Sequence, residues 1–344
     1  MRRMGRLVAA VAVAAAIAAT TAGEAAVADT LAAVRERGAL RCGVDEAVVP
    51  GFAARDESGA WTGFDVDYCR AIAAAVLGDA AAVRFVEVDT EAGPAALAAG
   101  RVDVLANGTA WTLGRDAAAG LDFPAVTFFD GQAFLVPRAL GVRSALELDG
   151  ARVCVLDGAR ALRRLDAFFT SHLMEHVVLV FRGGGELFAA YAAGLCDAAT
   201  AERSRLGAAL ADLDAPAAHL VLPELVAKSP RALAVAEGDP VWADVVRWVH
   251  MALLAAEEHG LDQARARTAV ATGGAAFGPG AADDDARAVA LGLAPGWADR
   301  AVAAVGHYGE LFERHLGPAT ASGLERGSNA LWRDGGLHYP LPLR

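Results

Sequence analysis

Short apolar runs alternate with alanine-rich stretches along residues 39 to 202. The runs ALRCGV, VRFVEV and VDVLAN predict strands, and the stretches 64–77 and 91–99 between them predict helices. The pattern restarts with GARVCVLDG, VVLVF and CDAATA as strands, divided by helices near 159–170 and 185–193. Strands that alternate with helices indicate mostly parallel, doubly wound sheets, which bind ligands at the carboxyl ends of their strands.

Two extended, proline-containing segments connect these halves. They contain DGQAFLVPRAL and PELVAKSPRALAV, and predict an outgoing crossing strand near 132–138 and a returning one near 226–235. Two crossings make a hinge, and the cleft between the lobes is then the natural ligand site. We therefore predict an α/β protein of two doubly wound lobes joined by a two-strand hinge. Its segments are lobe 1 (29–135), lobe 2 (136–228), a return to lobe 1 (229–265) and a C-terminal extension (266–344) that packs on lobe 1.

The first 28 residues have the layout of a secretory signal peptide. Three arginines precede an apolar run from Leu7 to Ala19, and Ala-Val-Ala ends at Ala28, where we expect cleavage. The apolar run is shorter than the ~20 residues that span a bilayer. Cleavage would remove three arginines and one glutamate and change the formal charge from −11 to −13. This acidic balance argues against nucleic acid and anionic membrane surfaces as partners.

All four cysteines follow the signal peptide, and an even number in an exported chain favours disulfides. Each half has one cysteine in a strand and one in the following helical region, which favours the pairs Cys42–Cys69 and Cys154–Cys196. No cysteine spacing fits a zinc site. His172 and His176 flank Glu175 but lack a third ligand, so we expect a turn there, no metal site and no cofactor.

The stretch NGTAWTLGRD places Arg115 three positions after Thr112, just beyond a predicted strand. Two interpretations are open. Arg115 caps a short helix and faces solvent, or it binds a carboxylate with its planar guanidinium, which stays charged at any relevant pH.

Essentially the whole chain after the signal peptide, including the C-terminal extension, resembles the periplasmic general L-amino-acid-binding proteins of ABC transporters, which are family 3 extracellular solute-binding proteins. The resemblance runs through WTGFDVDYCRAIAAAVLGD, GRVDVLANGTAWTLGRD, LDFPAVTFFDGQAFLV and the terminal RGSNALWRDGGLHYPLPLR. It implies a type II periplasmic-binding-protein fold that closes on a free amino acid and presents it to the transmembrane permease subunits. It also implies a monomer in the periplasm that is not an enzyme, and it agrees with the two intralobe disulfides.

The same resemblance assigns Arg115 to the ligand's α-carboxylate. It places the ligand beside Gly108, Ala110, Trp111 and Thr112. A threonine is usual where this chain has Ala110, so a backbone donor is kept and a hydroxyl is lost. Thr109 should point to the opposite side of an extended chain. Phe52 and Trp111 are either apolar walls of the site or core residues.

In lobe 2 the resemblance points to Gly158, Arg160 and Glu202. Gly158 is kept, but Ala159 and Arg160 replace hydroxyl-bearing residues, and Glu202 replaces the aspartate that pairs with the α-ammonium. Two cations, Arg115 and Arg160, would favour an acidic amino acid or a dicarboxylate. Alternatively Arg160 faces solvent and Glu202 pairs with Arg203 or Arg205.

Two other functions stay open. Some proteins of this fold are dehydratases, which need a carboxylic acid in the cleft as a proton donor. Glu202 is the candidate for that role in this chain. A drifted sensor or scaffold that binds no amino acid is the third possibility.

Overall fold

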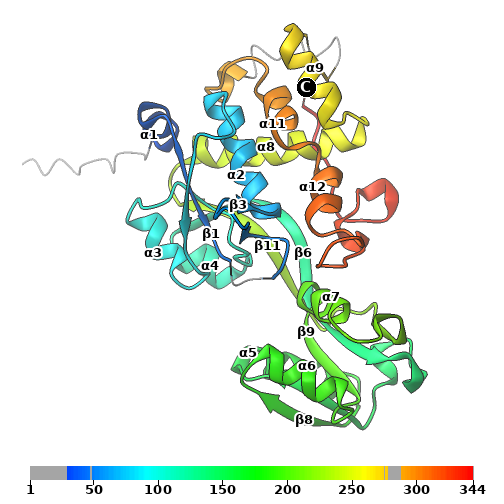
Figure 1. Cartoon of the computed structure of the whole chain (residues 1–344). Coiled ribbons are helices and arrows are strands. Elements are labelled where there is room, and N and C mark those ends of the chain that lie inside the picture. The colour runs from blue at the N-terminus through cyan, green and yellow to red at the C-terminus, as the bar shows by residue number, and fades with distance from the viewer. Residues whose placement is uncertain (1–28, 47–48, 275, 278–287, 344) are drawn as a thin grey trace, which may run out of the picture.

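The computed structural model describes residues 29–46, 49–274, 276–277 and 288–343, and the predicted signal peptide lies outside them. Two lobes are joined by a narrow waist (Figure 1). No described helix has the length and apolar character needed to cross a bilayer.

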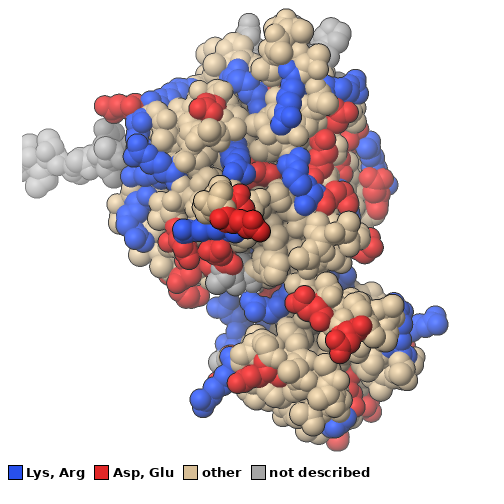
Figure 2. All heavy atoms as spheres, in the orientation of Figure 1, with Lys and Arg blue, Asp and Glu red and all other residues tan. Residues whose placement is uncertain are grey.

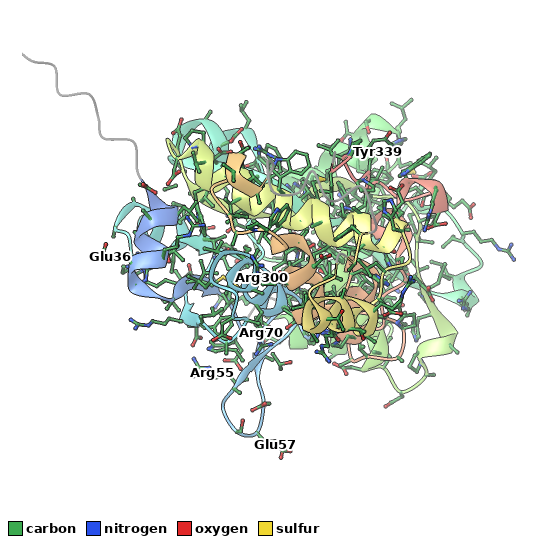
Figure 3. The ribbon with its side chains drawn as sticks, turned by 90° about the horizontal axis from the view of Figure 1, so that it is seen from above. Glu36, Arg55, Glu57, Arg70, Arg300 and Tyr339 are labelled. Carbon is green, nitrogen blue, oxygen red and sulfur yellow. A yellow bond between two sulfur atoms is a disulfide. The ribbon has the colours of Figure 1, made fainter. Side chains whose placement is uncertain are left out.

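Lobe 1 is built on three parallel strands in the order β4 (Val83–Glu87), β1 (Leu40–Val44) and β5 (Val104–Leu105). Helices α2 (Phe64–Leu77) and α3 (Gly93–Ala98) connect them. Twelve of the fourteen α2 residues are buried, which explains why this alanine-rich segment has no polar face. The short hairpin β2 (Ala54–Arg55) and β3 (Trp61–Thr62) projects from the lobe, with Glu57 at its tip (Figure 3).

Lobe 2 repeats this arrangement. Strand β7 (Ala151–Leu156) lies between the parallel strands β8 (His176–Phe181) and β9 (Ala198–Glu202). Helices α5 (Ala159–Ser171) and α6 (Gly184–Ala192) connect them, and α7 (Arg203–Ala211) follows β9 at the waist (Figure 1).

Two antiparallel strands, β6 (Leu121–Pro137) and β11 (Ala227–Ala236), cross between the lobes. Strand β6 pairs with β11 as far as Gln132 and with β9 from Gln132 onward, so one sheet continues through the waist. A further short strand, β10 (His219–Val221), pairs with the end of β6. The predicted α/β architecture of two lobes joined by two strands is confirmed. The outgoing strand, however, begins at residue 121 and not near 132. The prediction missed its first part because register shifts against β11 interrupt the alternation of apolar and polar residues that marks a strand in sequence.

The C-terminal helices cover lobe 1. Helices α8 (Pro240–Glu258), α11 (Trp297–Val305) and α12 (Tyr308–His315) pack on α2, as does α1 (Thr30–Arg37), and α9 (Gln263–Thr272) packs on α11. Asp67 of α2 accepts a hydrogen bond from Arg314 at 2.9 Å and lies 2.8 Å from Nε2 of His315. A buried carboxylate of α2 therefore anchors α12.

Both predicted disulfides, Cys42–Cys69 and Cys154–Cys196, are present. Each joins a strand to a later segment of the same lobe. Bridges that close loops of 27 and 42 residues stabilise a fold by roughly 3–4 kcal/mol each.

Two buried imidazoles attach the end of the chain to lobe 1. His338 packs 5.6 Å from the ring of His250 and 4.4 Å from that of Tyr308, and the Tyr68 hydroxyl lies 2.9 Å from Nδ1 of His250. Burial lowers the pKa of His250 to about 3. Burial, assisted by His250 and Arg326, also lowers the pKa of His338. Both histidines are therefore neutral in the folded protein at pH 7.

We expect these histidines to make the fold acid-sensitive. Below pH ~6.5 the unfolded chain binds protons that the folded chain does not, so the free energy of unfolding falls by about 1.4 kcal/mol per pH unit for each histidine. Asp65 has the opposite effect, because burial raises the pKa of its carboxyl to about 7 and the folded state keeps a proton that the unfolded state loses. Urea denaturation between pH 7 and 5 should show a steeper loss of stability for Asp65→Asn than for the wild type. Equal slopes would contradict this assignment.

Candidate functional site

Residues 107–112 form a turn that the lobe 1 core holds in place. The buried Asn107 donates through Nδ2 to the carbonyls of Val88 and Asp89, each at 3.1 Å. Thr109 is also fully buried and donates to Asn107 Oδ1 at 2.7 Å. Gly108 has a φ of +74°, a conformation that favours glycine. Thr109 thus points into the core, as its place in an extended segment predicts, and does not replace the hydroxyl missing at Ala110.

Arg115 lies in the short helix α4 (Leu113–Ala118), whose N-cap is Thr112. Its Nη1 donates to the Ala110 carbonyl at 3.3 Å, and its Nη2 lies 3.4 Å from Oε1 of Glu91. The Arg115 side chain is only 18% exposed, whereas that of Glu91 is 88% exposed. An ion pair with so exposed a partner contributes little. The guanidinium is held beside Ala110, and the carboxylate that it contacts is easily displaced.

Ala110 is connected to the returning strand. It forms an isolated β-bridge with Arg231 of β11, and the flanking Trp111 amide donates to the Pro230 carbonyl at 2.9 Å. The Trp111 ring is 39% exposed and stacks on Phe123 with centroids 5.6 Å apart. Trp111 therefore offers one apolar surface next to Ala110 and Arg115.

Phe52 belongs to the core and not to an exposed wall. Its side chain is fully buried, packs edge-on against Phe64 and Phe128, and lies under the guanidinium of Arg231 at 4.4 Å. Of the two interpretations of Phe52, the core one describes this structure. A ligand reaches this ring only if the surrounding residues move.

The lobe 2 candidates come from the ends of two neighbouring strands. Gly158 follows β7 and caps the N-terminus of α5, and Arg160 is exposed in the first turn of that helix. Glu202 is the last residue of β9, pairs with Gln132 of β6 and is half-buried. Since β7 and β9 are parallel, both candidates lie at the same edge of the lobe 2 sheet.

Glu202 does not pair with the arginine that follows it. Arg203 donates to the carbonyls of Leu222 and Pro223, at 3.1 and 2.7 Å. Among the described residues no hydrogen bond or ion pair of the Glu202 side chain is found. A half-buried carboxylate in this state is available to a cationic group.

The sequence interpretation missed Asp130, Ser204 and Arg231, which form a buried charged cluster where the two crossing strands meet α7. Its one visible signal was a charged residue inside the otherwise apolar run PRALAV. An open depression of about 640 Å³ lies elsewhere in lobe 2, lined among others by Arg164, Phe168 and Glu224.

In the part of the chain that the structure describes, no group of three or more His, Cys, Asp or Glu side chains is placed to hold a metal ion. The segment around His172 is a turn between α5 and β8, and His176 lies 3.0 Å from Asp166.

Comparisons with known proteins identify the family of the chain. Residues 40–269 match the model of the bacterial extracellular solute-binding proteins, family 3. The chain is 40% identical to the general L-amino acid-binding periplasmic protein AapJ of Rhizobium johnstonii, over 93% of this chain and 94% of the relative. It is 42% identical to the glutamate/glutamine/aspartate/asparagine-binding protein BztA of Rhodobacter capsulatus, over 96% and 97%.

A solved structure shares the same architecture. The periplasmic binding protein of an ABC transporter from Brucella ovis, with glutathione bound, matches 92% of this chain and all of its own with a TM-score of 0.76 and 40% identity. These relatives are solute-binding proteins and not enzymes, which supports binding over the dehydratase alternative. The chain belongs to the family 3 bacterial extracellular solute-binding proteins.

Proposed function

We propose that this protein is the extracytoplasmic solute-binding component of an amino-acid ABC transporter. It captures a carboxylate-bearing small molecule between its lobes and delivers it to the transmembrane permease subunits. The observation that carries the proposal is the Arg115 guanidinium, which is held at the Ala110 carbonyl and whose ion-pair partner among the described residues is the exposed, displaceable carboxylate of Glu91. The amino-acid-binding relatives, which match almost the full chain, support it.

In this proposal Arg115 binds the ligand's α-carboxylate. Its fork of N–H donors fits two carboxylate oxygens, and a ligand that takes the place of Glu91 keeps the guanidinium neutralised. The Ala110 backbone amide adds a donor, and Trp111 covers the apolar part of the ligand. Gly108 and Thr112 shape the turn and the helix start that place these groups.

Lobe 2 supplies the opposite half of the site. Glu202 receives the α-ammonium, and the first turn of α5 after Gly158 offers backbone donors to an anion. Arg160, exposed in that turn, adds a positive charge that neutral amino acids do not use. Figure 2 shows both basic and acidic side chains near the waist, so the preference for an anionic ligand rests on Arg115 and Arg160 themselves. Glutamate, aspartate or a small dicarboxylate is therefore the preferred ligand class. The name of the BztA relative includes glutamate and aspartate together with glutamine and asparagine.

The cellular setting follows from the same proposal. The signal peptide is cleaved after Ala28 and the mature chain acts in the periplasm as a monomer. Its partners are the ligand and the permease, and it needs no cofactor.

A thermal-shift screen of the twenty amino acids and several dicarboxylates tests this function. Ligands that bind the folded state raise the melting temperature, by an amount that grows with the ratio of ligand concentration to Kd. Stabilisation by at least one carboxylate-bearing amino acid or dicarboxylate is expected. A protein that none of them stabilises would favour the drifted sensor or scaffold.

A further inference from the structure

Three buried side chains from three separate segments meet at the hinge: Asp130 of β6, Ser204 of α7 and Arg231 of β11. Their residues are 2%, 0% and 7% exposed. Arg231 Nη2 lies 3.0 Å from Asp130 Oδ2 and donates to Ser204 Oγ at 2.7 Å. Ser204 Oγ in turn donates to Asp130 Oδ2 at 2.6 Å. Each member of this hinge triad contacts the other two.

On the lobe 1 side, the backbone at Arg231 is connected to the turn formed by residues 107–112. The backbone of Arg231 forms the β-bridge with Ala110, and the next amide, that of Ala232, donates to the Thr109 carbonyl at 3.0 Å. The backbone at Arg231 therefore fixes the turn that precedes Arg115, while the Arg231 side chain belongs to the triad.

On the lobe 2 side, the triad is connected to Glu202 through the start of α7. Ser204 is two residues further along the chain, in the first turn of α7, and its backbone amide donates to Asp130 Oδ1 at 3.2 Å. Asp130 thus accepts both a side-chain and a backbone hydrogen bond from the start of α7. Side chain and backbone together leave this helix start little freedom to rotate, and Glu202 precedes it directly.

The chemistry of the triad suits positioning better than stabilisation. A buried ion pair adds little net stability compared with apolar residues of the same volume, whereas its charge-assisted hydrogen bonds have narrow preferred geometries. The stacking of Arg231 over the buried Phe52 ring, at 4.4 Å, adds a further constraint on the guanidinium.

We propose that the hinge triad sets the position of Glu202 relative to Ala110 and Arg115, so that Ser204 and Arg231 are positioning residues for recognition of the ligand's α-ammonium. The inference rests on the proposed function and adds to it. The triad connects both halves of the site through the hinge.

L-Glutamate and glutarate provide the test, because they differ only in the α-ammonium group. Calorimetry with the wild type should show tighter binding of L-glutamate, and Glu202→Gln should remove most of that preference. Ser204→Ala keeps the Asp130–Arg231 ion pair but removes the hydroxyl that ties both to α7. It should weaken L-glutamate binding about tenfold, the effect of one lost hydrogen bond to a charged group, with glutarate binding unchanged.

Two further variants complete the design. Arg231→Lys keeps the charge but removes the Nε donor, which lies 3.2 Å from Asp130 Oδ2, and the planar group that stacks on Phe52, so it should lose the same preference as Ser204→Ala. Ser144→Ala is the matched control, because Ser144 Oγ donates to Glu224 Oε1 at the same 2.6 Å in lobe 2, outside the triad. It should keep the wild-type preference.

The outcomes separate the inference from the function on which it rests. If Glu202→Gln abolishes the preference for L-glutamate but Ser204→Ala and Arg231→Lys retain it, the positioning role is wrong and the proposed function stands. Equal losses for both ligands in Ser204→Ala would likewise overturn the role, since they indicate general damage to the site. A wild type without preference, or one that binds neither ligand, would overturn the assignment of Glu202 and the inference with it.

Discussion

Arg115→Lys should weaken the binding of L-glutamate at least tenfold, although the charge of the site is unchanged. Lysine offers a compact charge on a flexible stem, so it loses both the bidentate fit to the carboxylate and the hydrogen bond that holds Arg115 Nη1 to the Ala110 carbonyl. One lost hydrogen bond to a charged group corresponds to roughly 1.5–3 kcal/mol, or a tenfold to hundredfold change in affinity. Titration calorimetry on the purified variant measures it directly.

Arg101→Lys serves as the control for this variant. Arg101 is exposed and lies in the turn between α3 and β5, so the same exchange there should leave both affinity and melting temperature unchanged. If Arg115→Lys also bound L-glutamate as tightly as the wild type, Arg115 would be a surface or capping residue, and the carboxylate site would have to be sought elsewhere.

The second large effect is on selectivity. Neutral amino acids such as alanine and leucine should bind more than about a hundredfold more weakly than L-glutamate. The groups that would hold the part common to all amino acids differ from the usual pattern at Ala110, Ala159, Arg160 and Glu202. Two lost hydroxyl contacts, at roughly 1.5 kcal/mol or more each, account for this factor. An additional acidic group that meets Arg160 restores the loss for glutamate, aspartate or a dicarboxylate.

Calorimetry of alanine, leucine, glutamine, glutamate and glutarate checks this selectivity. Ala110→Thr provides a gain-of-function control, since a restored hydroxyl should strengthen the binding of neutral amino acids about tenfold. Micromolar or tighter binding of alanine, leucine and glutamine by the wild type would show that Arg115 and the backbone amides suffice, and the preference for acidic ligands would be wrong.

The local patterns of the sequence predicted most of the fold. The helix expected over 64–77 is α2, Phe64–Leu77, and that expected near 159–170 is α5, Ala159–Ser171. Both begin after a glycine. The α2 segment is rich in alanine, a strong helix former, and the α5 segment alternates apolar and polar residues with the period of a helix. The disulfide pairs were predictable for a related reason, since each joins a strand to a nearby segment of its own lobe.

Long-range features were harder to predict. Asp130 and Arg231 are separated by 101 residues, and nothing near either one indicates the other. Phe52 was assigned to two environments because an aromatic residue after Pro-Gly fits a binding wall as well as a core. The burial of its ring under Arg231 became visible only with both crossing strands in place. Arg115 was predictable as a candidate from its spacing, but its contact with the exposed Glu91 was not.

Capture of the ligand between the lobes is the central claim, and small-angle X-ray scattering with and without saturating L-glutamate tests it most directly. Closure of two lobes about the hinge formed by β6 and β11 makes the molecule more compact. The account predicts a smaller radius of gyration for the wild type with L-glutamate, and no change for an Arg115→Ala variant at the same ligand concentration. An unchanged radius of gyration in a wild-type sample that calorimetry shows to be saturated would contradict the account.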